Sequence, residues 1–305
     1  MRVLGTWYWV LGPIFNEFRP KSIIMKRIPL LYLLLVPFFS FSQSEVQYAE
    51  NPFRGTRIIN GHSVKTLWEG EMEMLISHRF GRLNGGAYEF FGLDQSTIRL
   101  GLDYGIKNWL MVGVGRSSLG KHLDAFGKMQ LLRQSAGKSF MPFSLTAFSS
   151  VALNTLKPGN PEEILPVHSR LSFVNQLLIA RKFNDRLSLQ IMPSWVHFNL
   201  VESAAETNDI FSLGLSGSYQ VSKNIALTFE YYQKIQGQLP QGRFNPIALG
   251  IDINTGSHVF QIHLTNANGM IGKAFIGETT GDWMNGDIHL GFNMSRTFKL
   301  KGRRY

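Results

Sequence analysis

The sequence predicts an all-β protein: an antiparallel up-and-down transmembrane β-barrel of about twelve strands. Two observations carry this prediction. Apolar and polar residues alternate along most of the chain, and long and short connections alternate between the periodic segments. Many of these segments also exceed the roughly five or six residues typical of soluble strands, and match the roughly nine to eleven that a tilted strand needs to cross a bilayer.

A secretory signal peptide is predicted over residues 25–42. It has a basic start at Lys26 and Arg27, an apolar run, and small residues at its end, so we expect cleavage near Ser42. A retained membrane helix is the disfavoured alternative, because the run is short and interrupted by prolines. Residues 1–24 are interpreted as an upstream extension, with translation starting at Met25, because a signal peptide normally opens with its basic part.

The mature chain is predicted to hold an N-terminal periplasmic segment, 43–65, and a barrel, 66–305. Short connections are expected on the periplasmic side and long external loops on the other. The expected strands are 66–80, 96–106, 109–118, 122–134, 140–152, 168–182, 187–199, 208–220, 224–235, 246–254, 257–267 and 286–300.

The stretch "DIFSLGLSGSYQV" shows the two faces of such a strand. Leu213 and Leu215 share one parity and Ser212 and Ser216 the other, which predicts a lipid-facing side and a lumen-facing side. In "LSLQIMPSWVHFNL" the apolar parity switches after Trp195, and this predicts a β-bulge beside the proline.

Composition excludes several classes of protein. The net charge is +10, and residues 1–42 hold five basic side chains and one acidic one, so the mature chain keeps about +6 without a concentrated basic face. We therefore expect no nucleic-acid binding. The absence of cysteine excludes disulfides, thiolate metal sites and a lipoprotein anchor.

Charged residues on the polar strand parities predict a lumen charge network. Carboxylates facing arginines can either fill the interior as a satisfied network or act as an electrostatic filter for a solute. The expected members are Glu69, Glu71, Glu73, Arg79, Arg99, Asp103 and Glu230.

The glycine-rich link 267–286 is a candidate plug loop. Its apolar residues would be poorly placed in water, so the link is expected either to fold into the barrel mouth or to pack on a neighbouring loop. The residues assigned to it are Phe275, Gly277, Glu278, Asp282 and Trp283.

No common catalytic or nucleotide-binding motif is present. Ser216 in "GLSGS" lies in mid-strand with no helix after it, which favours a lumen-facing serine over a nucleophile. His197, His263 and His289 fall on polar parities and could converge on a metal, but single hydrogen bonds in the lumen are favoured. We expect no catalytic residue, no metal and no cofactor.

Two stretches resemble a known family. They are "ISHRFGRLNGGAYEFFGLDQSTIRLGLDYGIKNWLMVGVGRSS" (76–118) and "FIGETTGDW" (275–283). Both are similar to the uncharacterised exported β-barrel proteins of Bacteroidota, a domain of unknown function. The resemblance spans most of the mature chain and implies an outer-membrane-type barrel, without implying an activity or site residues.

The function expected from the sequence is non-enzymatic passage or binding of a small solute through a charged lumen in the bacterial outer membrane. The partners expected are outer-membrane lipid, the barrel-assembly machinery during insertion, and a small solute. Two alternatives stay open: an outer-membrane lipid hydrolase, and a soluble exported barrel that binds a ligand.

Overall fold

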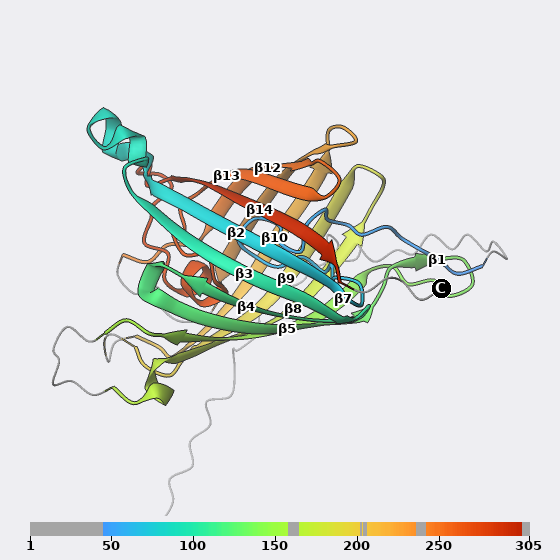
Figure 1. Ribbon diagram of the computed structural model, residues 1–305, viewed down its shortest axis with the longest axis horizontal. Coiled ribbons are helices and arrows are strands. Elements are labelled where there is room, and N and C mark those ends of the chain that lie inside the picture. Colours follow the sequence, from blue (N-terminus) through green and yellow to red (C-terminus); the bar gives the residue numbers. More distant parts are fainter. Residues whose placement is uncertain (1–44, 158–164, 202, 204–205, 236–241, 301–305) are drawn as a thin grey trace, which may run out of the picture. The chain divides into compact units, whose positions relative to one another are not determined.

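Twelve strands of the described residues form a closed antiparallel barrel, in which consecutive wall strands pair with one another and β14 pairs with β2 (Figure 1). The computed structural model describes residues 45–157, 165–201, 203, 206–235 and 242–300, all in one compact unit. The predicted extension and signal peptide lie outside these residues. No helix in the described part is long and apolar enough to cross a membrane.

The strands confirm the predicted fold class and number. They are β2 (Glu71–Arg82), β3 (Ser96–Lys107), β4 (Leu110–Ser117), β5 (His122–Leu132), β7 (Ser144–Asn154), β8 (Leu171–Lys182), β9 (Leu187–Phe198), β10 (Asp209–Gln220), β11 (Ile225–Lys234), β12 (Ile247–Asn254), β13 (His258–Thr265) and β14 (His289–Lys299). A two-residue pair outside the barrel, β1 (Gln47–Tyr48) with β6 (Ser135–Ala136), was not expected.

The links define two rims. Links 108–109, 133–143, 183–186, 221–224 and 255–257 lie at one end, named here the short-turn rim, and the chain also enters β2 and leaves β14 there. Strands β2, β4, β7, β9, β11 and β13 end at the other rim, the long-link rim, where the described linking residues are 83–95, 118–121, 155–157, 165–170, 199–201, 203, 206–208, 235, 242–246 and 266–288. Three of these long links carry short helices: η1 (Leu83–Gly92), η3 (Val167–Arg170) and η4 (Lys273–Gly277), while the tight 118–121 link holds η2 (Leu119–Lys121).

The period of two residues sorts side chains as predicted. In β10, Leu213 and Leu215 are each 42% exposed on the outer wall, while Ser212 and Ser216 are buried inside. The same alternation follows the neighbouring strands, so an apolar wall faces outward around the barrel. Such a wall suits acyl chains, which offer no hydrogen bonds and need none.

The predicted bulge in β9 is wrong. Ile191, Pro193 and Trp195 face outward, Val196 and Phe198 are buried inside, and β9 keeps one unbroken register with β10. The apolar residues lie inside because an apolar segment from the long-link rim packs against them, with η4 in contact with β9. An inward valine therefore reflects a filled lumen and not a shifted strand.

The structure departs from the expected periplasmic segment over 43–65. Residues 53–67, named here the inner hairpin, enter the barrel from the short-turn rim, and the first barrel strand begins only at Glu71. The chain reverses where the Ile58 amide donates to the Gly61 carbonyl, 2.9 Å away, and Arg57 pairs with His62 as an antiparallel bridge. Apolar side chains inside a strand wall gain the same burial as a core, which a free tail could not provide.

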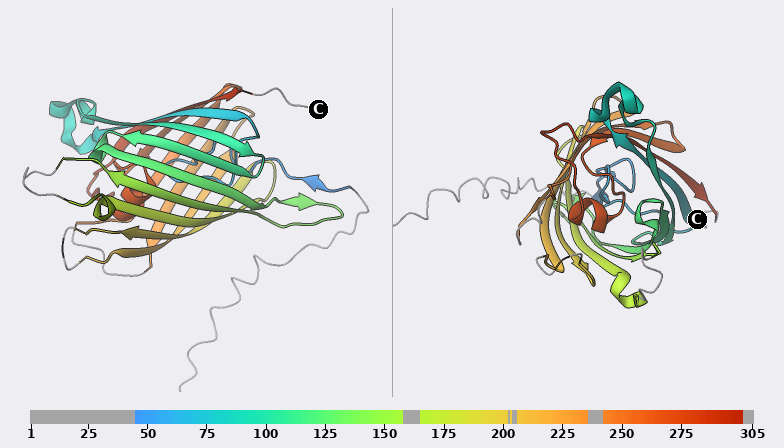
Figure 2. Two further views of the ribbon diagram at one scale, coloured as in Figure 1. Left: turned by 60° about the horizontal axis from the view of Figure 1, so that its bottom comes forward. Right: turned by 90° about the vertical axis from the view of Figure 1, so that its left-hand side faces the viewer.

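The inner hairpin and the inward-folded link 266–288, named here the inward loop, fill the barrel from opposite ends. Viewed from the long-link rim, both lie within the ring of strands (Figure 2). Together with wall residues they make one apolar cluster inside the barrel. Its members from these two segments are Phe53, Ile58, Ile59, Val64, Leu67, Ala267, Phe275 and Ile276.

A lipid-facing wall predicts a position-dependent cost for charge. Leu215→Arg, near the middle of β10, should destabilise the protein in bilayers by about 2–4 kcal/mol, whereas Val221→Arg, beyond the end of that strand, should cost about 0–1 kcal/mol. Denaturant unfolding in lipid vesicles measures both. Equal costs for the two variants would contradict a bilayer around β10.

Candidate functional site

Glu230 on β11 holds the tip of the inner hairpin. Its carboxylate, 2% exposed, accepts the Gly61 amide at 2.9 and 3.1 Å and the Ile59 amide at 3.4 Å. Gly61 fits here because it has no side chain: a Cβ would lie 2.3 Å from the hydroxyl oxygen of Tyr232. A buried carboxylate needs donors, and the hairpin backbone supplies them.

The next wall strands hold the same tip through amide side chains and an arginine. Arg79 Nη2 donates to the Asn60 side chain at 2.8 Å, and Asn293 donates to the Ile59 carbonyl at 2.8 Å. Gln261 donates to the Ile58 carbonyl at 2.7 Å. The bonds from Asn293 and Gln261 satisfy backbone carbonyls that the hairpin, being no part of the sheet, would otherwise bury without partners.

Charged groups lock the flanks of the hairpin. Arg57 lies 3.5 Å from Asp103 and donates to Nδ1 of His62 at 2.8 Å. The Thr56 hydroxyl donates to Glu73, and Lys128 Nζ donates to the Lys65 carbonyl at 2.5 Å. Each of these ionisable wall side chains contacts a hairpin group.

The predicted charge network is thus divided between the lumen and the rim. Glu73, Arg79, Arg99, Asp103 and Glu230 are all buried inside the barrel. Apart from Arg99, which forms a bidentate pair with Asp124 at 2.9 and 2.5 Å, they contact the inner hairpin. None of the five forms an ion pair with another of the five among the described residues.

Two predicted members lie at the short-turn rim instead. Glu69 is half exposed and pairs with Lys107 at 3.0 Å, and Glu71 accepts the Trp68 amide at 3.1 Å. Glu69 precedes β2, and Glu71 is its first residue, paired with Lys299 of β14. The polar parity leads to a buried position at Glu73, whereas at Glu69 and Glu71 it reaches the rim of the wall.

The inward loop packs where the plug loop was expected. Phe275 is 2% exposed with its ring centroid 5.3 Å from that of Tyr232, and a Cβ on Gly277 would lie 2.6 Å from Phe198. Glu278 pairs with Lys273 at 2.7 Å. This half of the loop therefore fills the interior.

Asp282 and Trp283 lie in the later, partly exposed half of the inward loop. Their carbonyls accept backbone amides in a turn, from Asn285 and Gly286, each at 3.2 Å. Between the earlier half and the hairpin tip, a cavity of about 30 Å³ is lined by Asn60, His62, Met270 and Phe275, among others. That volume holds about one water molecule.

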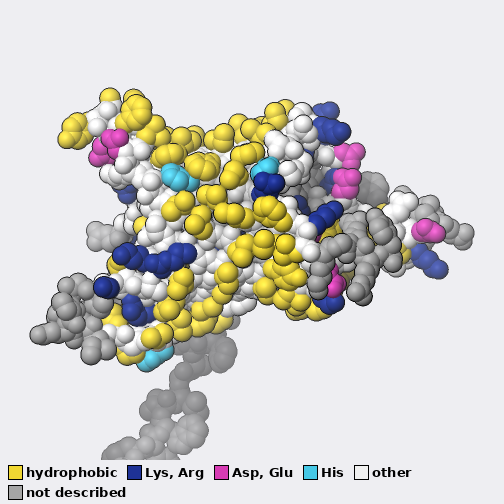
Figure 3. All heavy atoms as spheres, viewed as in Figure 1, with side chains coloured by type: hydrophobic (Ala, Val, Ile, Leu, Met, Phe, Trp, Pro, Cys, Tyr) yellow, Lys and Arg dark blue, Asp and Glu magenta, His cyan; other side chains and the backbone are white. Residues whose placement is uncertain are grey.

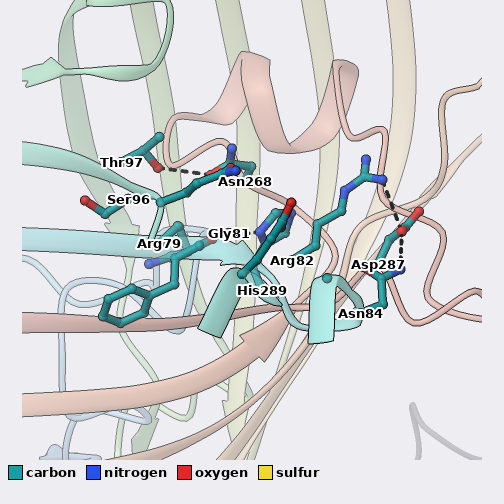
Figure 4. A pocket seen from close by; sticks show the side chains of 13 residues that line it. Arg79, Gly81, Arg82, Asn84, Ser96, Thr97, Asn268, Asp287 and His289 are labelled. Carbon is teal, nitrogen blue, oxygen red and sulfur yellow. Dashed lines mark hydrogen bonds and ion pairs between the residues drawn. The ribbon is translucent and has the colours of Figure 1, made fainter. Parts of the chain in front are cut away.

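A larger pocket of about 620 Å³ opens at the long-link rim above Arg79 (Figure 4). Its lining is polar. Thr97 donates to Asn268 at 3.0 Å across it, and Asp287 pairs with Arg82 at 3.1 Å and accepts from Asn84 at 2.7 Å.

Asp287 stays ionised at the edge of this mouth pocket. The hydrogen bond from Asn84, that from the Asp282 amide, and the charge of Arg82 hold the pKa of the Asp287 carboxyl below its ordinary value. Arg82 is engaged in this ion pair, and the pocket lining also offers the guanidinium of Arg79, amides and hydroxyls, groups that suit a small polar solute.

The three histidines do not converge. His263 and His289 are buried inside, but His197 faces outward, where Nδ1 donates to Asp209 at 2.8 Å. The prediction that His197 faces the lumen is wrong for the same reason as the bulge. No group of three or more potential metal ligands occurs among the described residues.

The outward His197–Asp209 pair does not assemble a hydrolase site. Asp209 also accepts the indole N–H of Trp195 at 2.7 Å, and the ring neighbours of His197 are Phe173 and Trp195. In the described part of the chain no serine or threonine hydroxyl is hydrogen-bonded to His197. Ser216 is buried inside the barrel, on the other side of the wall.

Architecture and site together define a membrane β-barrel whose interior is filled by two of its own segments. The chain belongs to the family described as membrane-bound β-barrel domain DUF5777, whose model matches residues 53–298. That range includes the inner hairpin and all twelve barrel strands except the last residue of β14. A comparison with curated proteins gives no match.

Several solved structures are similar to this chain. A NanC porin has a TM-score of 0.48 at 8% identity, over 75% of this chain and 100% of that chain. The KdgM porin has 0.44 at 10% identity, over 75% and 99%. The COG4313 outer membrane channel from Pseudomonas putida F1 has 0.44 at 13% identity, over 77% and 98%.

Gly61→Val should push the inner hairpin away from β11, because Tyr232 is fully buried and cannot make room for a new side chain. The chain has no cysteine, so Ser63→Cys, a near-isosteric change at a fully buried position, gives a clean reporter. We expect thiol labelling of the reporter in bilayers to speed up by about tenfold, since a lost bond to a charged group shifts the opening equilibrium by ~1.5 kcal/mol or more.

Gly127→Val is the matched control for this experiment, since a Cβ there meets nothing within 4 Å. It should leave the labelling rate of Ser63→Cys unchanged. If Gly61→Val labels no faster than this control, the hairpin does not depend on the close approach to Tyr232.

Proposed function

We propose that this protein is a non-enzymatic outer-membrane barrel that binds a small polar solute at its external mouth and passes it when the inner hairpin moves aside. The long-link rim faces the exterior and the short-turn rim the periplasm, as in other bacterial barrels. The chain is exported with a cleaved signal peptide, 25–42, and inserted by the barrel-assembly machinery.

Arg79 is the residue on which this proposal rests, because it connects the mouth pocket with the tip of the inner hairpin. It lines the mouth pocket, and it is also the wall residue whose guanidinium donates to Asn60 at the hairpin tip. Its Nε is buried and has no hydrogen-bond partner among the residues that the structure describes. A solute that reaches Arg79 competes with Asn60 for the guanidinium, so binding at the mouth weakens the hold on the hairpin.

The hairpin is suited to move because side-chain contacts, and no backbone ladder, hold it to the barrel wall. It adds no strand to the wall, so its displacement leaves every barrel ladder intact. Releasing it exposes the polar inner faces of β10 and β11, including Ser216 and Thr228, whose hydroxyls have no partner in the described residues. Water and a polar solute satisfy such groups.

Planar-bilayer recording tests this function. The wild-type protein should conduct little, and Glu230→Ala should raise the mean conductance about tenfold or more, because loss of charge-assisted bonds of ~1.5–3 kcal/mol favours the open state. Glu69→Ala, which removes a carboxylate at the rim, should leave it unchanged.

Heat-modifiable gel mobility checks that each variant remains a folded barrel. If folded Glu230→Ala conducts no more than the wild type, the hairpin is a permanent filling, and the protein binds a solute without passing it.

A further inference from the structure

Basic side chains lie on the surface at the long-link rim (Figure 3), some of them where β4 and β5 meet the link to β8. Arg116 at the end of β4 donates through Nη1 to the Lys121 carbonyl at 2.6 Å and to the Thr155 hydroxyl at 2.9 Å. Arg170 donates to the Leu156 carbonyl. These bonds bring Arg116, Lys121 and Arg170 onto one surface, named here the rim cation patch.

The patch lacks carboxylates within the described residues. Several other cations of the barrel form ion pairs, as Lys107 does with Glu69 and Lys273 with Glu278. No ion pair involves Arg116, Lys121 or Arg170 in the part of the chain that the structure describes. Asp124, the acid of β5, points inward to Arg99. Like charges held together in this way favour an external anion.

The patch also stands directly on the lipid-facing wall. Arg116 faces outward between Leu100 and Leu123, its register partners, which are 48% and 46% exposed. Val114, the next outward residue of β4, is 56% exposed. An outward arginine costs little only near the bilayer interface, so Arg116 lies at head-group level with an acyl-facing surface beneath it.

We propose that the rim cation patch is a binding site for the phosphate groups of an acylated, phosphorylated glycolipid in the leaflet at the long-link rim. Arg116 uses only Nη1 within the described residues, which leaves Nε and Nη2 for two parallel bonds to a phosphate. Lys121 and Arg170 add charge, and acyl chains pack on Leu123 and Val114. That this is the outer leaflet rests on the orientation proposed above; the phosphate site itself does not.

Native mass spectrometry of the mature protein from detergent tests the site, with a diphosphorylated hexa-acyl glucosamine disaccharide as the probe. The wild type should retain this lipid at least about tenfold more strongly than the same lipid stripped of its phosphates. The double variant Arg116→Gln/Lys121→Gln should lose about tenfold in apparent affinity, the equivalent of ~1.4 kcal/mol.

Arg186→Gln is the matched control, because Arg186 is exposed and lies at the short-turn rim. It should bind within twofold of the wild type, and Arg116→Lys should recover part of the loss. Equal retention of the lipid by the double variant and the wild type would overturn the proposal. Displacement of the lipid by millimolar inorganic phosphate would also overturn it, since the patch would then be a site for the free anion and not for the lipid. Neither result depends on whether the barrel conducts.

Discussion

A bilayer cannot hydrogen-bond to an exposed backbone, and this constraint governs the rest of the structure. It requires the twelve strands to close, with β14 paired to β2, so that no sheet edge meets lipid. Closure fixes which parity faces out, because a strand in a closed ladder presents alternate side chains to the two sides. Leu215 on one side of the β10 backbone and Ser216 on the other follow from that geometry.

Closure also creates an interior that must be filled or hydrated. This barrel fills much of it with its own chain, and the choice of wall residues reflects that. Where the inward loop packs, the inner wall is apolar, as at Val196 and Phe198; where the hairpin backbone packs, it carries acceptors and donors such as Glu230 and Asn293. Most charged side chains inside the barrel therefore hold the hairpin, while Arg99 pairs with Asp124.

Local periodicity was enough to predict the strands, their number and their outward faces, because each strand's alternation depends only on adjacent residues. The inner hairpin was missed because its contacts are remote: Gly61 and Glu230 are 169 residues apart. The sequence feature that could have indicated the hairpin was the group of apolar residues Ile58, Ile59 and Val64, which would be unfavourably exposed in a solvated periplasmic tail. The bulge in β9 and the inward assignment of His197 failed together, since both assumed that the inner wall is polar throughout.

Residues 53–67 lie packed inside a lipid-embedded barrel, and hydrogen exchange in lipid nanodiscs tests this packing most directly. The amides of Ile58, Gly61 and Ser63 are bonded and buried, so a peptide covering them should exchange as slowly as one from β10. Exchange of that peptide within seconds, while β10 remains protected, would contradict the account.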